Sequence, residues 1–389
     1  MDFQFTEEQE ALREAVMRFS RERLLPDYMK REKEGVIDRA LLREMGALGV
    51  LGVSLPASLG GMDACSITTG LVIEAVAYGD FNFSYLPLLS SLLGGLLAKH
   101  GKPEIVEKWV PKIAAGEAIL ALGLTEPGVG SDAARLTLRA RRDGDGSDGD
   151  GYVLNGEKTS ISAADQAEIA IVFARTGSEE ARAKGVSAFL VELDAPGITR
   201  TRLDDVGTTI IGRGSIFFDD VKISTDALLG EEGAGFTQIM QGFDFSRALI
   251  GLQCLAAARA SLDETWAYVK ERQAFGSPLV KYEGVTFPLV EAETMYEAAR
   301  LLCYKTLWLR DQGRPHTAEA AMCKWWAPKL SFDMIHQCLL LHGHTGYSKE
   351  TPHQQRMRDV MGLEIGDGTA QIQKIIIARE KVGRIAVPW

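Results

Sequence analysis

Residues 122–132 read LGLTEPGVGSD, and at this stretch the chain changes from helix-forming to strand-forming sequence. Before it, apolar residues such as Leu12, Val16 and Phe19 recur at helical spacing. After it come short runs rich in Val, Ile, Phe and Thr, such as AEIAIVFART and SIFFDDVKI, separated by Gly, Asp and Pro. From Gly235 onward the helical period returns and continues to the end.

The order helices, strands, helices predicts an α+β protein with three domains. We expect a helical domain over residues 1–118, an antiparallel β-domain over 119–233 and a second helical domain over 234–389. Closely spaced strands with no helical sequence between them favour an antiparallel barrel or sandwich in the middle domain.

The composition is that of an ordinary globular protein: 389 residues, 46% apolar and 25% charged. A formal net charge of −10 argues against a nucleic-acid surface. The N-terminus, MDFQFTEEQE, lacks the features of a secretory signal, and the apolar stretches are too short to span a bilayer. Five scattered cysteines without CxxC spacing are typical of reduced thiols. We therefore expect a cytoplasmic protein.

Two stretches resemble metal sites and are set aside. The run DGDGSDGDG (143–151) begins like an EF-hand loop, but Asp148 stands where the loop requires Gly, and Leu154 cannot supply the last carboxylate. A solvated hairpin loop fits it better. His342 and His344 have no neighbouring cluster of ligands in the sequence. No metal site is predicted, and the usual hydrolase, P-loop and dinucleotide motifs are absent from the sequence.

The stretch 122–132 has the composition of a ligand-binding turn. Pro127 fixes the turn, and Gly128 and Gly130 allow a ligand to approach the backbone closely. Thr125 and Ser131 offer hydroxyl groups. By itself the stretch is equally compatible with a tight loop that binds nothing.

A second informative stretch is EIGDGTAQIQ (364–373). Thr369 is a preferred N-cap, and Ile372 and Ile376 follow at helical spacing, so the stretch predicts a turn entering a helix. Asp367, just before the Gly, is on this ground an ordinary turn residue, and a catalytic role is the alternative.

Four motifs in order decide between these alternatives. The sequences EPGVGSD, NGEKTSIS (155–162), RQAFG at the start of 272–287, and GDGTAQIQ resemble, at these separations, the motifs of the acyl-CoA dehydrogenase family. The resemblance extends over almost the whole chain. It implies an N-terminal helical domain, a middle β-domain and a C-terminal four-helix bundle. It also implies bound FAD, an acyl-CoA thioester substrate, an electron-transfer flavoprotein or similar acceptor, and a homotetramer.

The resemblance assigns roles residue by residue. It implies that Arg272 and Phe275 reach the FAD of a neighbouring subunit. The FAD contacts that it implies are Leu122, Leu124, Thr125, Gly130, Ser131, Ser160, Ile161, Ser162, Arg272, Phe275, Glu283, Gly343, Thr369 and Gln371. The substrate contacts that it implies are Ser131, Asp244, Arg247 and Gly368.

The resemblance makes Asp367 the base that removes the α-proton, with Arg247 supporting it. Some members place a Glu base at the position of Ser246, and serine cannot act in that way. Donors must also hold the thioester carbonyl as enolate charge develops, and the family uses the backbone N–H of the base for this.

Three departures from the family pattern concern the acyl pocket. Most members have Glu at the position of Asp367, and the shorter side chain withdraws the carboxylate by about 1.5 Å. Gly366 stands where an aromatic residue is common, and Ser160 replaces a common Trp. All three changes remove volume, which suits a ring branched at Cα. They resemble the branch that includes cyclohexane-1-carboxyl-CoA dehydrogenase.

Three other readings remain. The enzyme would act on a short or branched acyl-CoA, or on an acyl group tethered to a carrier protein. In the third reading the chain is a flavin-binding partner protein without catalysis, although Asp367, Arg247, Thr369 and Gln371 are all retained.

Overall fold

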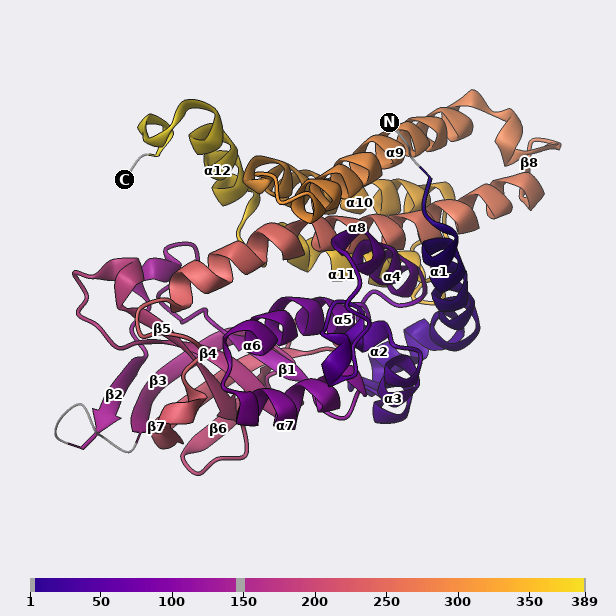
Figure 1. Ribbon diagram of the computed structural model, residues 1–389. Coiled ribbons are helices and arrows are strands. Elements are labelled where there is room, and N and C mark those ends of the chain that lie inside the picture. Colours follow the sequence, from indigo (N-terminus) through magenta and orange to yellow (C-terminus); the bar gives the residue numbers. More distant parts are fainter. Residues whose placement is uncertain (1–3, 145–150, 388–389) are drawn as a thin grey trace.

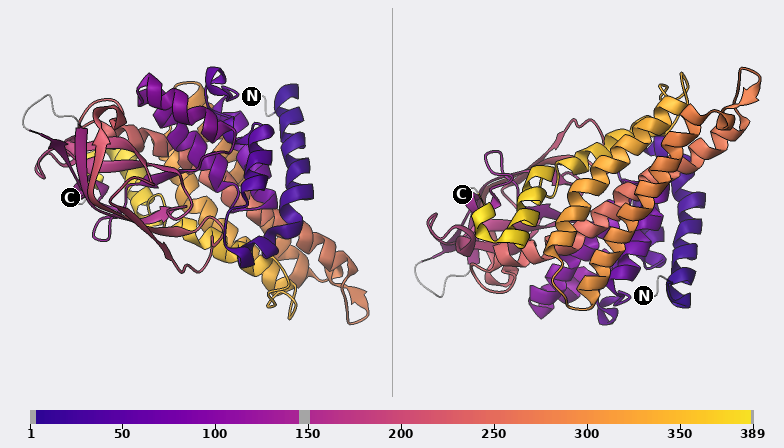
Figure 2. Two further views of the ribbon diagram at one scale, coloured as in Figure 1. Left: turned by 90° about the horizontal axis from the view of Figure 1, so that it is seen from below. Right: turned by 90° about the horizontal axis from the view of Figure 1, so that it is seen from above.

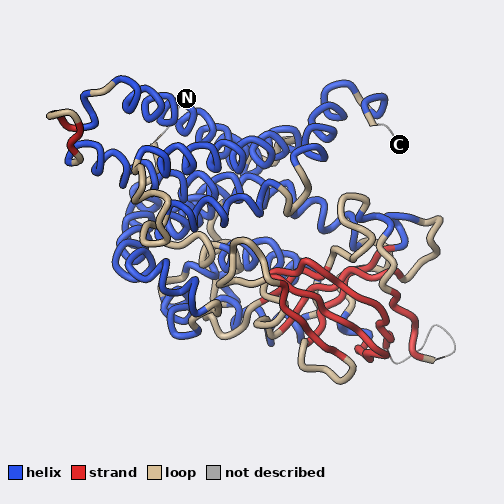
Figure 3. Tube along the Cα trace, turned by 180° about the vertical axis from the view of Figure 1, so that it is seen from behind, coloured by secondary structure: helices blue, strands red, loops and turns tan. Residues whose placement is uncertain are grey.

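A computed structural model of the protein describes residues 4–144 and 151–387. Helices come first, the strands follow, and a group of long helices completes the chain (Figure 1). Figure 3 shows the main strands gathered at one end of the molecule, with helices occupying most of the remainder. The α+β class and the order of the three blocks predicted from the sequence are confirmed.

The N-terminal block begins with a capped helix. Thr6 Oγ1 accepts a hydrogen bond from Gln9 N at 3.2 Å, and Gln9 Oε1 accepts one from Thr6 N at 3.0 Å, which forms a capping box. The α4 helix is buried along almost its whole length and packs against α8 and α9. The α-helices are α1 (Glu7–Phe19), α2 (Tyr28–Glu34), α3 (Arg39–Ala47), α4 (Ser66–Gly79), α5 (Tyr85–Leu89), α6 (Gly95–His100) and α7 (Pro103–Ala114).

The strands of the middle block form one continuous sheet in the order β1-β4-β2-β3-β7-β6, and β5 pairs with β4. Most pairs are antiparallel, as predicted, but β1 and β4 are parallel. β4 is also parallel to β2, where Arg139 pairs with Arg175. The strands are β1 (Leu120–Gly123), β2 (Arg139–Asp143), β3 (Gly151–Ser162), β4 (Ile169–Arg175), β5 (Val186–Glu192), β6 (Ile198–Leu203) and β7 (Arg213–Ser224).

The stretch 143–151 connects paired antiparallel strands. Asp143 lies opposite Gly151 across the β2–β3 pair, so the prediction of a hairpin connection is confirmed. Residues 145–150 themselves, to which the discarded calcium reading applied, lie outside the described residues.

Three long helices, α8 (Gly235–Glu271), α9 (Glu283–Asp311) and α10 (Thr317–Leu341), run side by side (Figure 2). They are followed by α11 (His353–Met361) and α12 (Ala370–Val382). The stretch 272–287 follows the end of α8 and contains the start of α9.

A small hairpin between α8 and α9 was not predicted. Its strands, β8 (Gln273–Ala274) and β9 (Ser277–Pro278), are joined by Phe275 and Gly276, whose φ angles are 49° and 77°. Two consecutive positive φ angles are the mark of a tight hairpin turn. The usual sequence signal for this turn is Asn-Gly or Asp-Gly, so Phe-Gly did not reveal it.

A buried carboxylate joins the three blocks next to the segment that carries Asp367. Asp359 of α11 accepts hydrogen bonds from Tyr28 Oη at 2.6 Å and from Asn82 Nδ2 at 2.9 Å. It also accepts one from Thr208 N at 2.6 Å, in the loop between β6 and β7. These contacts fix α11 against both other blocks and so fix the start of the segment that follows.

Candidate active site

Asp367 lies in a short segment between a 3-10 turn (Gly362–Glu364) and α12. Its φ angle of 54° is left-handed, a conformation that Asp adopts more readily than most residues. Thr369 is the N-cap of α12, and its Oγ1 accepts a hydrogen bond from Ile372 N at 3.4 Å. The predicted cap is therefore confirmed at Thr369, and the Asp367 side chain does not cap the helix.

Two cations act on the Asp367 carboxyl group. Burial raises the pKa of Asp367, and the charges of Lys324 and then Arg247 oppose that rise. Arg247 is buried on α8 and donates to Asp244 Oδ1 at 3.0 Å. Thr317 Oγ1 donates to the other Asp244 oxygen at 2.6 Å. Arg247 Nε is buried and has no hydrogen-bond acceptor among the described residues.

Lys324 was missed by the analysis of the sequence. It is fully buried on α10, and its Nζ donates to the backbone oxygens of Leu363 at 2.5 Å and Gly368 at 3.4 Å. A signal was present: Lys324 follows Ala320 by four residues and precedes Ala327 by three, so helical spacing places it on the apolar face of its helix.

The first two motifs meet where the end of β1 lies beside the C-terminal half of β3, a place here termed the sheet edge. Thr159 N donates to Thr125 O at 2.9 Å, which ties the stretch leaving β1 to the end of β3. The register of β3 against β7 shifts between Lys158 and Ile161, and Ser160 within this bulge has a φ of 60°. A bulge of this kind turns a side chain out of the regular alternation of a strand.

The stretch after β1 is open to a ligand. Glu126 and Val129 exchange backbone hydrogen bonds of 3.0 Å that close the turn. A Cβ built on Gly128 or Gly130 would meet no atom within 4 Å, and Ser131 is exposed. Open backbone flanked by hydroxyl groups fits the heteroatom-rich edge of a flavin ring.

A buried ion pair beneath this stretch was also missed. Lys158 Nζ donates to Glu126 Oε1 at 2.7 Å and to Leu124 O at 3.1 Å. The signal was the alternation of β3, because Tyr152, Leu154 and Lys158 share the parity of its buried face.

The predicted flavin contacts fall into three places in the chain. Leu124 and Ile161 are buried, whereas Gln371 is exposed. Near the sheet edge lie Leu122, Leu124, Thr125, Gly130, Ser131, Ser160, Ile161 and Ser162. Around the start of α12 lie Thr369 and Gln371, next to the predicted base Asp367 and the predicted substrate contact Gly368.

The third group lies far from the other two within the chain. Arg272 and Phe275 belong to the β8–β9 hairpin, which stands at the opposite end of the bundle from the main sheet (Figures 1 and 2). Glu283 begins α9 beside it, and Gly343 is exposed in the loop after α10. The fold of one chain therefore does not bring these residues to the sheet edge.

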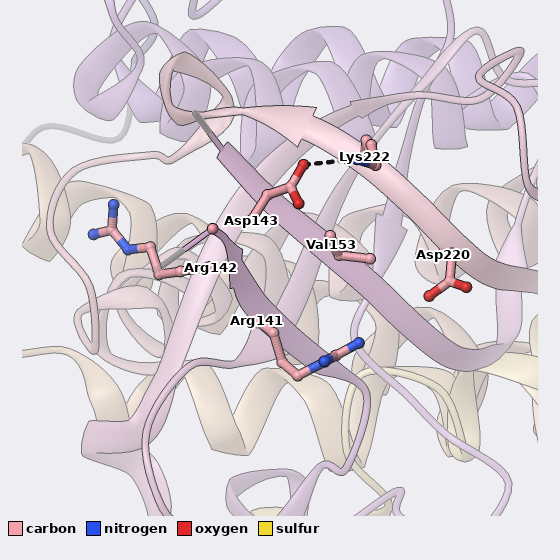
Figure 4. A pocket seen from close by; sticks show the side chains of 7 residues that line it. Arg141, Arg142, Asp143, Val153, Asp220 and Lys222 are labelled. Atoms are coloured by element: carbon pink, nitrogen blue, oxygen red, sulfur yellow. Dashed lines mark hydrogen bonds and ion pairs between the residues drawn. The ribbon is translucent and has the colours of Figure 1, made fainter. Parts of the chain in front are cut away.

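A separate cavity of about 470 Å³ opens on the outer part of the sheet (Figure 4). Within it Lys222 Nζ donates to Asp143 Oδ2 at 3.0 Å. None of the predicted site residues lines it. The lining residues are Arg141, Arg142, Asp143, Gly144, Val153, Asp220 and Lys222.

No helix within residues 4–144 and 151–387 is long and apolar enough to cross a membrane. The same residues contain no group of three or more His, Cys, Asp or Glu side chains placed to hold a metal ion.

Known proteins place this architecture in one family. The N-terminal, middle and C-terminal domain models of acyl-CoA dehydrogenase match residues 6–117, 121–221 and 233–382. The chain belongs to the acyl-CoA dehydrogenase family.

Individual relatives cover nearly the full length. The chain is 34% identical to a probable acyl-CoA dehydrogenase, YngJ, of Bacillus subtilis, over 98% of this chain and 99% of that protein. It is 35% identical to benzylmalonyl-CoA dehydrogenase of Aromatoleum aromaticum, with the same coverage. The solved butyryl-CoA dehydrogenase of Megasphaera elsdenii superposes with a TM-score of 0.93 and 30% identity, covering 98% of this chain and 100% of that one.

Proposed function

We propose that the protein is an FAD-dependent dehydrogenase that introduces an α,β double bond into an alicyclic acyl-CoA thioester. The expected substrate is cyclohexane-1-carboxyl-CoA, and the expected product is cyclohex-1-ene-1-carboxyl-CoA. Membership of the acyl-CoA dehydrogenase family supports the reaction and the cofactor. The choice of acyl group is our own inference from the residues around Asp367.

The observation that carries the proposal is a carboxylate that lies within the electrostatic influence of two buried cations. Burial makes Asp367 a stronger base than an exposed aspartate, while Lys324 and Arg247 favour its ionised form. Such a group is suited to remove the α-proton of a thioester. The backbone N–H of Asp367 is the proposed donor to the carbonyl oxygen as negative charge develops there.

The flavin would be held by the sheet edge and by a neighbouring subunit. Bound FAD supplies the acceptor for the hydride that leaves Cβ. Thr125, Ser131, Ser160 and Ser162 are the hydroxyl groups proposed to contact it. Arg272 carries the charge proposed to pair with a phosphate group of the neighbouring subunit's FAD.

Exposed apolar residues support the homotetramer that such sharing requires. Phe275 is 97% exposed at the tip of the hairpin. Phe287, Val290, Leu301 and Trp308 follow one another at helical spacing along α9, and all four side chains are exposed. An apolar stripe of this kind is expected to be covered by another subunit.

Space next to the base supports a wide acyl group. A Cβ built on Gly366 would have its nearest contacts at 3.5 Å and 3.7 Å, so a side chain is sterically tolerated there and its absence leaves room. A relative named for benzylmalonyl-CoA, whose acyl group carries a ring, is consistent with this inference. The likeness to a butyryl-CoA dehydrogenase supports the alternative, a short or branched-chain substrate.

We expect the 1-ene as product because the carboxylate considered as a second base, that of Asp80, is already engaged by other groups. Asp80, in the N-terminal block, is engaged by Arg31, whose Nε donates to Asp80 Oδ2 at 2.9 Å. Its other oxygen accepts from Asn82 N at 2.8 Å. A carboxylate committed in this way is a structural group, and a 1,4-dehydrogenation would need a free one.

Flavin bleaching by a panel of thioesters tests the proposal. Cyclohexane-1-carboxyl-CoA is expected to reduce the flavin faster than straight-chain thioesters of similar carbon number. Faster reduction by a straight-chain thioester favours the short-chain alternative. Preference for a carrier-protein thioester over the matching CoA thioester favours the tethered alternative.

The variant Asp367→Asn tests the base. It is expected to retain FAD and thioester binding and to lower the flavin reduction rate by about 10²–10⁴-fold, because an amide cannot accept the α-proton. A reduction rate near that of the wild type would show that Asp367 is not the base. A wild-type flavin that no thioester reduces would favour the partner-protein reading.

A further inference from the structure

Lys324 lies directly beneath the segment that presents Asp367. Its Nζ donates to the backbone oxygen of Leu363, four residues before Asp367, and to that of Gly368, one residue after it. The two carbonyl groups mark the two ends of the left-handed turn. A single ammonium group therefore fastens both ends of the turn.

Lys324 is also unusual because its charged ammonium group is buried. It is fully buried and forms no ion pair with any residue in the described part of the chain. A buried ammonium group is costly without a compensating anion. Burial lowers the pKa of Lys324 to about 8, and Asp367 is the anion that most opposes this shift. Lys324 is consequently still mostly protonated near pH 7.

Among the groups around the turn, Lys324 has the largest electrostatic effect on Asp367, followed by Arg247. Burial raises the pKa of Cys254 and of Tyr85, so both are neutral near pH 7. Lys324 or Asp367 interacts electrostatically with Arg247 and Cys254 of α8, Tyr85 of α5 and Glu364 of the 3-10 turn. Arg379 of α12 acts on Arg247.

We propose that Lys324 is a positioning residue for the base: it fastens the turn that presents Asp367 and keeps the carboxylate ionised through its positive charge. The inference rests on the proposed function, since it assumes that Asp367 accepts the α-proton. It adds a residue that does not touch substrate or flavin and that acts only through Asp367.

The chain offers a matched control for the fastening role. Gln373 is fully buried, and its Nε2 donates to the backbone oxygens of Asp367 at 3.2 Å and Gly368 at 3.1 Å. It holds the same turn with hydrogen bonds but carries no charge. Lys324→Gln removes the charge, whereas Gln373→Leu loosens the turn and leaves the charge in place.

Two measurements on the FAD-bound enzyme separate these effects. One is the pH dependence of the flavin reduction rate with the best thioester. The other is the pH dependence of enolate formation from bound 3-oxobutanoyl-CoA, followed by absorbance. In that reaction the acidic proton between the two carbonyl groups passes to Asp367 and no hydride moves, so it reports proton transfer without turnover.

In both profiles the signal falls at low pH as Asp367 becomes protonated, and this part of the profile is the acid limb. Lys324→Gln is expected to move the acid limb to higher pH by at least about one pH unit, because loss of a nearby positive charge raises the pKa of a carboxyl group. Gln373→Leu is expected to lower the plateau rate and leave the limb in place. An unmoved limb in Lys324→Gln, or an equal movement in both variants, overturns the inference.

If Lys324→Gln does not bind FAD, Lys324→Arg decides, because it retains the charge. A limb at the wild-type position then supports the inference, and a limb moved upward contradicts it. A wild-type flavin that no thioester reduces would contradict the proposed function instead. An unchanged profile in an active Lys324→Gln variant would contradict this inference alone.

Discussion

Removal of the buried Lys158 charge should both destabilise the protein and loosen the loop of residues 122–132, which is proposed to contact the flavin. The side chain of Lys158 is fully buried, that of Glu126 is 4% exposed, and their ion pair measures 2.7 Å. Removing one partner of a buried pair typically costs about 3–5 kcal/mol. Glu126 retains three other donors, from Thr137 N and Oγ1 and from Leu138 N, at 2.6–2.8 Å. We therefore expect about 3 kcal/mol, the lower end, for Lys158→Met.

The assay is the free energy of unfolding in denaturant, with FAD saturating and with FAD removed. Domains of ordinary stability have about 5–15 kcal/mol, so the variant should still fold. Weaker FAD binding is expected in addition, because Lys158 Nζ also holds the Leu124 carbonyl at the root of the loop. Lys222→Met is the control: its pair with Asp143 in the same sheet is exposed, and its loss should cost less than about 1 kcal/mol.

The double variant Lys158→Met/Glu126→Gln tests the cause. If the loss comes from an uncompensated carboxylate, neutralising Glu126 should recover part of the stability lost in the single variant. The reasoning is refuted if Lys158→Met stays within about 1 kcal/mol of the wild type, the range expected of an exposed pair.

Three further predictions concern other parts of the molecule. Burial raises the pKa of Asp359 to about 7, above its unfolded value, so its contribution to stability should be lost as pH rises from about 4 to 7, and Asp359→Asn should lack this component in unfolding measured against pH. An equal pH dependence in the variant would contradict that assignment. Arg272→Ala should weaken FAD retention by about 1.5–3 kcal/mol, measured by equilibrium dialysis, and unchanged retention would remove Arg272 from the phosphate site. Gly366→Tyr should slow flavin reduction by cyclohexane-1-carboxyl-CoA more than by butyryl-CoA, and equal slowing would refute the wide-pocket reading.

Local features of the fold could be predicted because they depend on neighbouring residues. The cap at Thr369 follows from a side chain that bonds to a backbone group three residues ahead. The parallel pairing of β1 with β4 could not be predicted, because it depends on which distant strands meet. Periodicity identifies the faces of an element, but it does not say which partner covers them.

The residues of the candidate site likewise fall into those that the sequence predicted and those that it did not. Motif spacing pointed to Asp367 and to the stretch 122–132, since both lie in short patterned sequences. Lys324 and Lys158 were overlooked because an isolated lysine is normally assigned to the surface. Their burial is explained only by what lies across from them in three dimensions, a backbone turn for Lys324 and Glu126 for Lys158.

The three separated parts of the candidate site share one backbone feature, a residue other than glycine with a left-handed φ angle. Ser160, Phe275 and Asp367 all have left-handed φ angles, 60°, 49° and 54°, and each belongs to a different motif. Left-handed φ outside glycine is unfavourable by about 1–2 kcal/mol and persists only where surrounding contacts enforce it. The contacts differ in kind: a strand bulge at Ser160, a hairpin turn at Phe275, and buried donors from Lys324 and Gln373 around Asp367. At Asp367 the donors are buried side chains of α10 and α12, so this is a position where a change remote in sequence should alter the chemistry.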